Sequence, residues 1–282
     1  MSVVTEAAKN MSVDGAKDVT KDASMDASLR FDSVSFRYGK QPLIEGFTAA
    51  ISEHRITSVI GPNGCGKSTL VKLANGFLRP QKGTVLLNGS DVLSVPAKER
   101  SRTMAVLSQA PATTAMTVRN LVGCGRFPYL SPEGKLSAED EEIVDEAIEM
   151  VGLDGYQDRD IRSLSGGERQ IAHLAMVIAQ DTPLVLLDEP TTFLDIQVCH
   201  RILGTIREMN QQMGKTFLIV IHDIDLALRY SQELIVIDSN HAFKQGSKDA
   251  ILASRAIDDA FGIKIVEHTD DGETTYAAIS HA

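Results

Sequence analysis

The chain has 282 residues, of which 43% are hydrophobic and 23% charged, an ordinary composition for a globular protein of one large domain or two small ones. No apolar run approaches the roughly 18 residues that span a bilayer, and no signal peptide opens the chain. We therefore expect a cytosolic protein, or one held at a membrane only through a partner. The net charge of −10 argues against a nucleic-acid partner.

The N-terminal segment, residues 1–27, is rich in Ser, Thr, Ala, Asp and Lys, a composition that predicts a disordered extension. Order is expected to begin near Leu29. Between residues 29 and 38 the apolar positions change from odd to even near Ser33, which predicts a strand with a bulge or break at that point. Tyr38 ends this strand and suits either a core position or a platform for a ligand.

Residues 61–69 read Gly-Pro-Asn-Gly-Cys-Gly-Lys-Ser-Thr and fit the phosphate-binding loop, between a predicted strand at 55–60 and a predicted helix at 69–75. We expect the three glycines to let the backbone curl with its N–H groups inward, forming an anion site with the helix N-terminus. Lys67 adds a charge toward the β- and γ-phosphates, and the Ser68 hydroxyl is placed to bind Mg²⁺. The nucleotide site then comprises Gly61, Pro62, Asn63, Gly64, Cys65, Gly66, Lys67, Ser68 and Thr69.

Cys65 occupies a variable position of this loop and allows two interpretations. The thiol is either small and inert, or its pKa is lowered by Lys67 and the helix N-terminus, which would make it reactive and protected by ATP. The other cysteines, Cys124 and Cys199, lie far away in the sequence without C-x-x-C spacing, so neither a disulfide framework nor a zinc site is expected.

The middle of the chain changes character. Asn88-Gly89 predicts a hairpin turn, and residues 103–107 predict a short buried strand. Strand patterns are then absent between about 110 and 180, which indicates a helical insertion. Within it, residues 137–140 form a capping box before a helix whose shared face we expect to hold Ile143, Ala147, Met150 and Val151.

This insertion ends in Leu-Ser-Gly-Gly-Glu at residues 164–168. Ser165 is an expected helix N-cap, and Gly166 and Gly167 expose backbone N–H groups at the helix start. The segment is therefore a second candidate anion-binding end in the same chain.

Two later strands end in polar residues. The apolar run 183–187 fits a central parallel strand buried on both faces, and Asp188 and Glu189 follow it. The run 216–221 repeats this pattern before His222. Ligands collect at the carboxyl ends of such strands, so we expect Asp188 to hold Mg²⁺ with Ser68 and Glu189 to activate a water.

Taken in order, these motifs resemble the full set of an ATP-binding-cassette (ABC) ATPase subunit. The resemblance covers residues 28–270, leaving 271–282 as a tail, and the Leu-Ser-Gly-Gly-Glu signature separates this family from other phosphate-loop proteins. It implies an α/β fold: a phosphate-loop NTPase core of the RecA-like type, an antiparallel β subdomain and an inserted α-helical signature subdomain at about residues 110–170.

The resemblance also implies roles for single residues. Tyr38 would stack on adenine, and Gln109 would contact Mg²⁺ and couple the site to a membrane partner. Catalysis would involve Lys67, Gln109, Glu189 as base and His222 at the γ-phosphate.

Assembly is implied as well. Ser165, Gly166 and Gly167 would close on ATP held by a second subunit of a head-to-tail dimer, with Asp195 communicating between the two. The further partners would be transmembrane permease subunits and, indirectly, a substrate-binding protein.

The branch within the family rests on weaker signs. Residues 117–122 and 125–128, with an aromatic residue at 193, are similar to importers of iron–siderophore, haem and cobalamin, although Ile171 stands where such subunits commonly carry a basic residue. An exporter subunit is an alternative that the sequence leaves open. A DNA-repair ATPase would need a long coiled-coil insertion, and a translation-factor cassette a second motif set; the chain shows neither.

Overall fold

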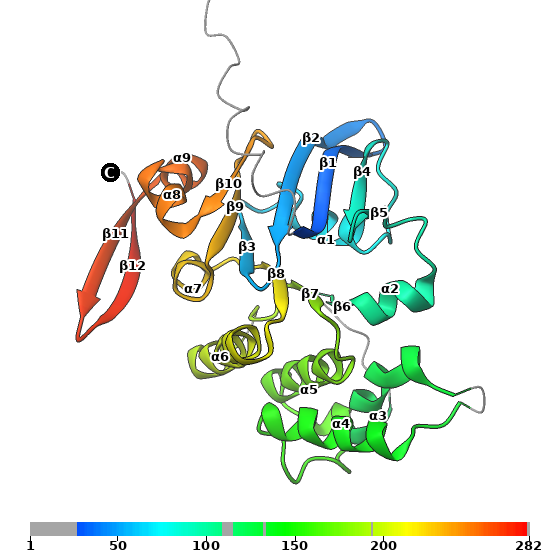
Figure 1. Cartoon of the computed structure of the whole chain (residues 1–282). Coiled ribbons are helices and arrows are strands. Elements are labelled where there is room, and N and C mark those ends of the chain that lie inside the picture. Colours follow the sequence, from blue (N-terminus) through cyan, green and yellow to red (C-terminus); the bar gives the residue numbers. More distant parts are fainter. Residues whose placement is uncertain (1–26, 109–114, 132–133, 193, 281–282) are drawn as a thin grey trace, which may run out of the picture.

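The computed structural model describes residues 27–108, 115–131, 134–192 and 194–280 (Figure 1). The expected extension lies outside this part except for Ala27. That residue begins the first strand, β1, so the predicted boundary at 27 is one residue too late.

One side of the molecule is an antiparallel sheet. Its strands follow the order β2, β1, β4, β5, with bounds Gln41–Ser52, Ala27–Tyr38, Lys82–Leu87 and Ser90–Asp91. The register of β1 against β2 shifts between Phe31 and Val34, and Ser33 has a φ of 50°. The predicted irregularity near Ser33 is confirmed, and it explains why the apolar positions change parity there.

The predicted Asn-Gly hairpin turn is confirmed between β4 and β5. Leu87 pairs with Ser90, and both Asn88 and Gly89 have positive φ, 48° and 79°. A two-residue turn of this kind needs positive φ at both positions, which Asn and Gly adopt most readily.

The second sheet carries the core. Its order is β10, β9, β3, β8, β7, β6, and all neighbours are parallel except β10 and β9. Every residue of β3, β7 and β8 is buried, so the prediction of a central parallel strand before Asp188 is confirmed. The bounds of the six strands, in sheet order, are Phe243–Ser247, Glu233–Ile237, Ile56–Ile60, Thr216–Val220, Leu184–Asp188 and Met104–Leu107.

Each face of this sheet packs on a different layer. Leu184 and Leu186 of β7 belong to the apolar cluster shared with the antiparallel sheet and α1 (Lys67–Ala74). Val185 and Leu187 point to the other cluster, which contains α5 (Gly166–Ala179), α6 (Ile196–Met213) and α7 (Ile224–Tyr230). Successive residues of a strand alternate between faces, so a strand with apolar layers on both sides needs a continuous apolar run.

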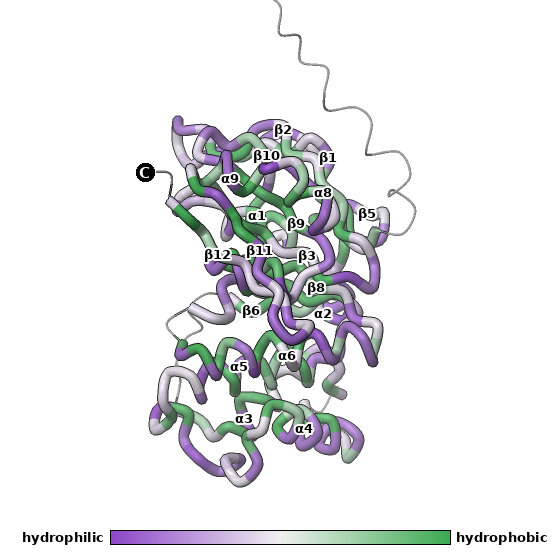
Figure 2. Tube along the Cα trace, turned by 90° about the vertical axis from the view of Figure 1, so that its left-hand side faces the viewer, coloured by the Kyte–Doolittle hydropathy of each residue, from purple (hydrophilic) through white to green (hydrophobic). Residues whose placement is uncertain are grey.

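The predicted helical insertion forms a separate block below the sheets (Figures 1 and 2). Both capping boxes are present, Ser137 with Asp140 and Ser165 with Glu168. One detail is wrong: Met150 is 41% exposed, while Val144 is fully buried beside Ala147. The remaining elements of the block and its approach are α2 (Ala97–Thr103), α3 (Val118–Gly123), two 3₁₀ segments, η1 (Cys124–Tyr129) and η2 (Ile161–Ser163), and α4 (Ala138–Met150).

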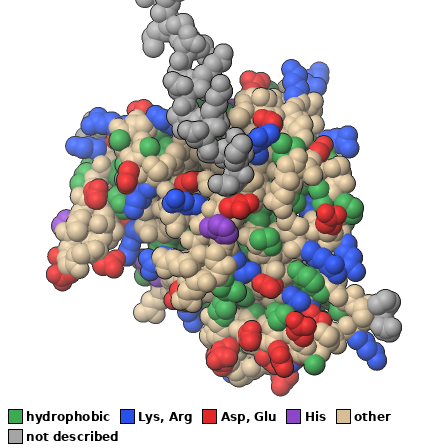
Figure 3. Space-filling view, in the orientation of Figure 1, with side chains coloured by type: hydrophobic (Ala, Val, Ile, Leu, Met, Phe, Trp, Pro, Cys, Tyr) green, Lys and Arg blue, Asp and Glu red, His purple; other side chains and the backbone are tan. Residues whose placement is uncertain are grey.

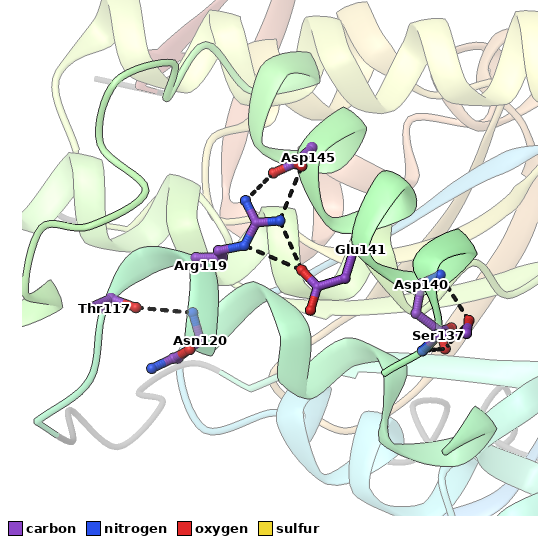
Figure 4. A network of polar contacts seen from close by, with 7 residues as sticks. All are labelled: Thr117, Arg119, Asn120, Ser137, Asp140, Glu141 and Asp145. Carbon is purple, nitrogen blue, oxygen red and sulfur yellow. Dashed lines mark hydrogen bonds and ion pairs between the residues drawn. The ribbon is translucent and has the colours of Figure 1, made fainter. Parts of the chain in front are cut away.

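Arginines tie this block together. Arg119 of α3 donates to Glu141 Oε2 at 2.7 Å and also contacts Asp145, both on α4 (Figure 4). Arg126 of η1 is more buried. Its Nε donates to Asp140 Oδ1 at 2.8 Å, its Nη1 donates to the Ala179 carbonyl at 2.9 Å, and its guanidinium lies 4.1 Å from the Tyr129 ring centroid.

The C-terminal part is not a tail. After α8 (Lys248–Ala253) and α9 (Ala256–Phe261), the chain forms a hairpin of β11 (Ile263–Asp270) and β12 (Glu273–Ser280). The predicted boundary after residue 270 falls in the turn of this hairpin, and β12 packs on α7. Tyr276 of β12 is 8% exposed and joins the larger apolar cluster, which fixes the hairpin to the core.

The buried Arg126–Asp140 pair gives a stability prediction. Arg126→Met should lower the free energy of unfolding by about 3 kcal/mol, because it leaves the buried Asp140 carboxylate without its cation. Urea denaturation followed by circular dichroism measures this. Arg162→Met is the matched control, since its pair with Asp160 is exposed and solvent screens it. An equal loss of unfolding free energy in both variants would show that the buried pair stabilises the protein no more than the exposed pair does.

Candidate active site

The phosphate-binding loop connects β3 to α1 and has the geometry of an anion site. Gly64 and Gly66 have φ values of 84° and 107°, which side chains disfavour, as predicted. At Gly61 our reason was wrong, because its φ is not positive. A Cβ there would lie 2.4 Å from the Ile237 carbonyl oxygen, so glycine is required by the close approach of β9.

Lys67 points into this loop. Its side chain donates from Nζ to the carbonyl oxygens of Gly61 and Pro62, at 2.7 and 3.0 Å, and the residue is 5% exposed. The loop carbonyls thus hold the ammonium group inside the loop. An anion at that point meets a fixed positive charge as well as the N-terminus of α1.

Ser68 and Asp188 meet across the sheet edge, as predicted. Ser68 Oγ donates to Asp188 Oδ1 at 2.9 Å, and Asp188 is 4% exposed at the end of β7. Burial raises the pKa of the Asp188 carboxyl, and the hydrogen bond from Ser68 opposes that shift. A hydroxyl and a carboxylate oxygen this close are the hard donors that Mg²⁺ prefers, so the residues present fit this ion.

Glu189 and His222 also meet, at the ends of β7 and β8. His222 Nε2 lies 2.5 Å from Glu189 Oε1, and Glu189 is 7% exposed. Glu189 has a φ of 55°, and its backbone N–H donates to the Val220 carbonyl at 3.1 Å. A positive φ at a glutamate is strained, and the neighbouring strand fixes it, so the carboxylate is aimed by the sheet itself.

Thr192 is a site residue that our sequence analysis did not identify. Its hydroxyl donates to Glu189 Oε2 at 3.1 Å, so both oxygens of that carboxylate have a protein contact. Nothing in periodicity points to Thr192. The only available signal was its position three residues after a carboxylate that ends a buried strand.

The other predicted residues lie in different places. Tyr38 is 52% exposed at the end of β1, so the core alternative is wrong, and its ring packs edge-on against Phe36 with centroids 4.9 Å apart. Stacking of Tyr38 on adenine stays a prediction. Gln109 lies outside the described residues, and its predicted roles stay predictions too.

The signature segment is built as a helix start. Ser165 Oγ accepts from the Glu168 N–H at 3.2 Å, and Glu168 Oε2 accepts from the Ser165 N–H at 2.8 Å. No atom lies within 4 Å of a Cβ built at Gly166, so this glycine faces open space. Because α5 lies in the block below the sheet and α1 above it, the structure does not bring the signature to the loop of its own chain (Figures 1 and 2).

Asp195 has a role within its own chain. Its Oδ1 accepts from the Val198 N–H at 2.9 Å and so caps α6. Communication across a dimer stays a prediction for this residue.

Burial of Cys65 favours the first of our two interpretations, the small inert thiol. Cys65 is 3% exposed, and burial raises the pKa of its thiol, while Lys67 opposes the shift only in part. The expectation of a lowered pKa is wrong because the side chain points into the protein beside Gly61 and away from the anion site.

Burial of Cys65 predicts its chemical behaviour. Burial raises the pKa of both the Cys65 and the Cys124 thiol, so access decides the order: maleimide should modify partly exposed Cys124 first and Cys65 only in denaturant. Peptide mapping after timed labelling measures the order. A Cys124→Ser variant isolates the slow phase, and labelling of Cys65 at the rate of Cys124 in the native protein would contradict the structure.

A phosphate-binding loop, a hydroxyl–carboxylate pair and a glutamate–histidine pair at one sheet edge define a phosphate-loop nucleoside triphosphatase. The comparisons narrow this class. The family model for ABC transporters matches residues 44–192. The achromobactin transport ATP-binding protein of Dickeya dadantii is 40% identical over 227 residues, 80% of this chain and 84% of that protein.

Two further comparisons agree. The iron(3+)-hydroxamate import ATP-binding protein of Bacillus subtilis is 38% identical over 86% of this chain and 91% of its own. A solved metal-chelate type ABC transporter in an inward-facing conformation shares the fold, with a TM-score of 0.78 at 23% identity over 90% of this chain and 98% of its own. The chain therefore belongs to the ABC transporter family, as an ATP-hydrolysing subunit.

None of the helices in the described part of the chain combines the length and the apolar character that crossing a membrane requires.

Proposed function

We propose that this chain hydrolyses ATP to power the import of an iron–siderophore complex. The chemistry rests on one observation, the convergence of Lys67, the Ser68–Asp188 pair and the Glu189–His222 pair at the carboxyl edge of the parallel sheet. The cargo rests on relatives. Those at 34–40% identity include transport or import ATP-binding proteins for achromobactin, iron(3+)-hydroxamate and petrobactin.

Residues of the loop and the sheet edge would divide the work on ATP. Lys67 and the loop N–H groups bind the β- and γ-phosphates, and Ser68 and Asp188 would hold Mg²⁺. The ion, when bound, neutralises charge on the phosphate oxygens. Tyr38 offers an exposed ring for the adenine at the end of β1.

Glu189 is the proposed general base. It is aimed past the end of β7 by its strained backbone and held by Thr192, which suits a carboxylate that must receive a proton from an attacking water. In the tautomer with a proton on Nε2, His222 donates to Glu189 Oε1, which lies 2.5 Å away. Its side chain is 40% exposed, which leaves it accessible to the γ-phosphate.

The signature would act on a second copy of the chain. Ser165, Gly166 and Gly167 present exposed or half-buried backbone at the start of a capped helix, away from their own loop. A head-to-tail homodimer would place each signature over the ATP bound by the partner. Permease subunits would hold this dimer at the cytoplasmic face of the membrane, with Gln109 coupling to them and a substrate-binding protein acting indirectly.

The proposed base gives a kinetic prediction. Glu189→Gln should keep ATP binding and lower turnover by about 10²- to 10⁴-fold, because the amide cannot accept the proton. Steady-state phosphate release and a separate ATP-binding titration measure the two parts. Glu267→Gln is the matched control, because it makes the same change at an exposed residue of β11. Turnover of Glu189→Gln at the unmodified rate would remove Glu189 from the role of base.

The proposed head-to-tail dimer gives a prediction about the mass of the protein in solution. Glu189→Gln protein should be a monomer without nucleotide and a dimer with ATP and Mg²⁺, because hydrolysis no longer separates the subunits. Light scattering coupled to size exclusion measures the mass. Adding Gly166→Trp should abolish the dimer, since it places bulk where the partner's phosphates would sit, while ATP binding stays. A monomer with ATP at high protein concentration counts against the assembly.

The cargo is tested by uptake. Deletion of the gene should stop uptake of radioactive iron as a siderophore complex, and the intact gene, but not Glu189→Gln, should restore it. Cobalamin is the second candidate, because a cobalamin import ATP-binding protein of Halobacterium salinarum is 37% identical over 81% of this chain and 57% of its own. Loss of cobalamin uptake with intact iron uptake would replace the first cargo by the second.

A further inference from the structure

A recess unrelated to the nucleotide site lies where the C-terminal hairpin meets the core. It has a volume of about 380 Å³, and four chain segments line it: α6, the end of α7, the start of α8 and β12. Figure 1 shows the hairpin beside α7. The lining residues that matter here are Arg207, Arg229, Tyr230, Lys248, Glu273 and Tyr276.

The recess is far from the nucleotide. Helix α6 begins at Asp195, near the carboxyl edge of the sheet, and runs back toward the opposite edge before β8. Arg207 lies twelve residues along it, which at the helical rise is roughly 18 Å from Asp195. A ligand in the recess would therefore be separate from ATP.

Cations dominate this recess although the chain carries a net charge of −10. Arg229 is neutralised, because it lies 3.8 Å from Asp225 and 3.4 Å from Glu273. Arg207 and Lys248 form no ion pair with any described residue. Figure 3 shows acidic side chains over the block that contains α4 and also on the C-terminal hairpin, which carries Asp270 and Glu273. The recess is thus a local positive site built against the overall charge.

Aromatic rings hold these two cations in place. The Arg207 guanidinium lies 5.0 Å from the Tyr230 ring centroid, and Lys248 Nζ lies 5.9 Å from that of Tyr276. Both rings are themselves fixed. The Tyr230 hydroxyl is 2.8 Å from His200 Nδ1, and the Tyr276 N–H donates to Asp225 Oδ1 at 2.7 Å. The donors are therefore positioned before any ligand arrives.

We propose that this recess binds a small soluble molecule carrying a phosphate or pyrophosphate group. The planar fork of Arg207 pairs with two phosphate oxygens, and Lys248 supplies a second charge from the other side of the recess. A lone carboxylate would fit this pair less well, because two cations from separate helices suit a group with several anionic oxygens. Tyr230 and Tyr276, which line the recess, offer apolar contact to the rest of the ligand.

Intrinsic tyrosine fluorescence can detect the binding of a ligand in this recess. It has no tryptophan and five tyrosines, and two of the five line the recess. Pyrophosphate is titrated into the full chain in metal-free buffer with ADP at saturation, so that the phosphate-binding loop is already filled. We expect a saturable change in tyrosine emission, and a smaller one in Tyr276→Phe.

Three variants test whether the change in tyrosine emission comes from pyrophosphate bound in the recess. Arg207→Gln and Lys248→Gln should each weaken pyrophosphate binding about tenfold, the effect of losing one charge-assisted contact. Lys264→Gln, an exposed cation on β11 of the same hairpin, should not alter it. ADP binding, measured separately, shows that each variant is folded and tests the nucleotide site independently. No change in emission, or equal weakening by all three variants, would overturn the proposal.

Discussion

The burial of β7 on both faces is the constraint on which the site depends. Its residues alternate between two apolar clusters, so the strand cannot move without opening both of them. Asp188 is the last residue of this strand and Glu189 follows it directly, so the packing of the strand fixes the position of both residues. The carboxylate that faces Ser68 and the one that faces His222 are therefore placed by hydrophobic packing, without help from a ligand.

The polar contacts at the site involve the groups that we expect to bind ATP and Mg²⁺. The loop carbonyls hold Lys67 inside the loop, and the Ser68–Asp188 hydrogen bond brings together two oxygen donors suited to one ion. Preorganised groups of this kind need little movement on binding. Burial raises the pKa of the Asp188 carboxyl, and the Ser68 hydroxyl opposes that shift.

The helical block is built differently from the core. Its apolar residues belong to the same buried cluster as one face of the parallel sheet, and capping boxes and arginines that cross between helices add polar contacts. Arg126 is central because it joins η1, α4 and the end of α5 in one buried contact set. The signature helix is thus fixed within the block.

The sequence by itself determined most of the elements and predicted the residues of the candidate active site. The Gly-rich loop, the caps at Ser137 and Ser165, the Asn88-Gly89 turn and the continuous run before Asp188 are local signals, because each depends on conformations that few residue types adopt or on a pattern set by burial on two faces. The order of the motifs then predicted membership of the ABC family, which the comparisons confirm.

Only the tertiary structure decided which neighbours these residues meet. Gly61 is glycine because β9 passes beside it, the pKa of the Cys65 thiol is raised because the side chain is buried, and the buried face of α4 includes Val144 and not Met150. The recess of Arg207 and Lys248 could not be predicted, since segments distant in the sequence line it. Thr192 lies only three residues from Glu189, but no local pattern assigns its hydroxyl to that carboxylate. Such contacts depend on how layers pack, and packing between distant segments leaves no periodic trace in either one.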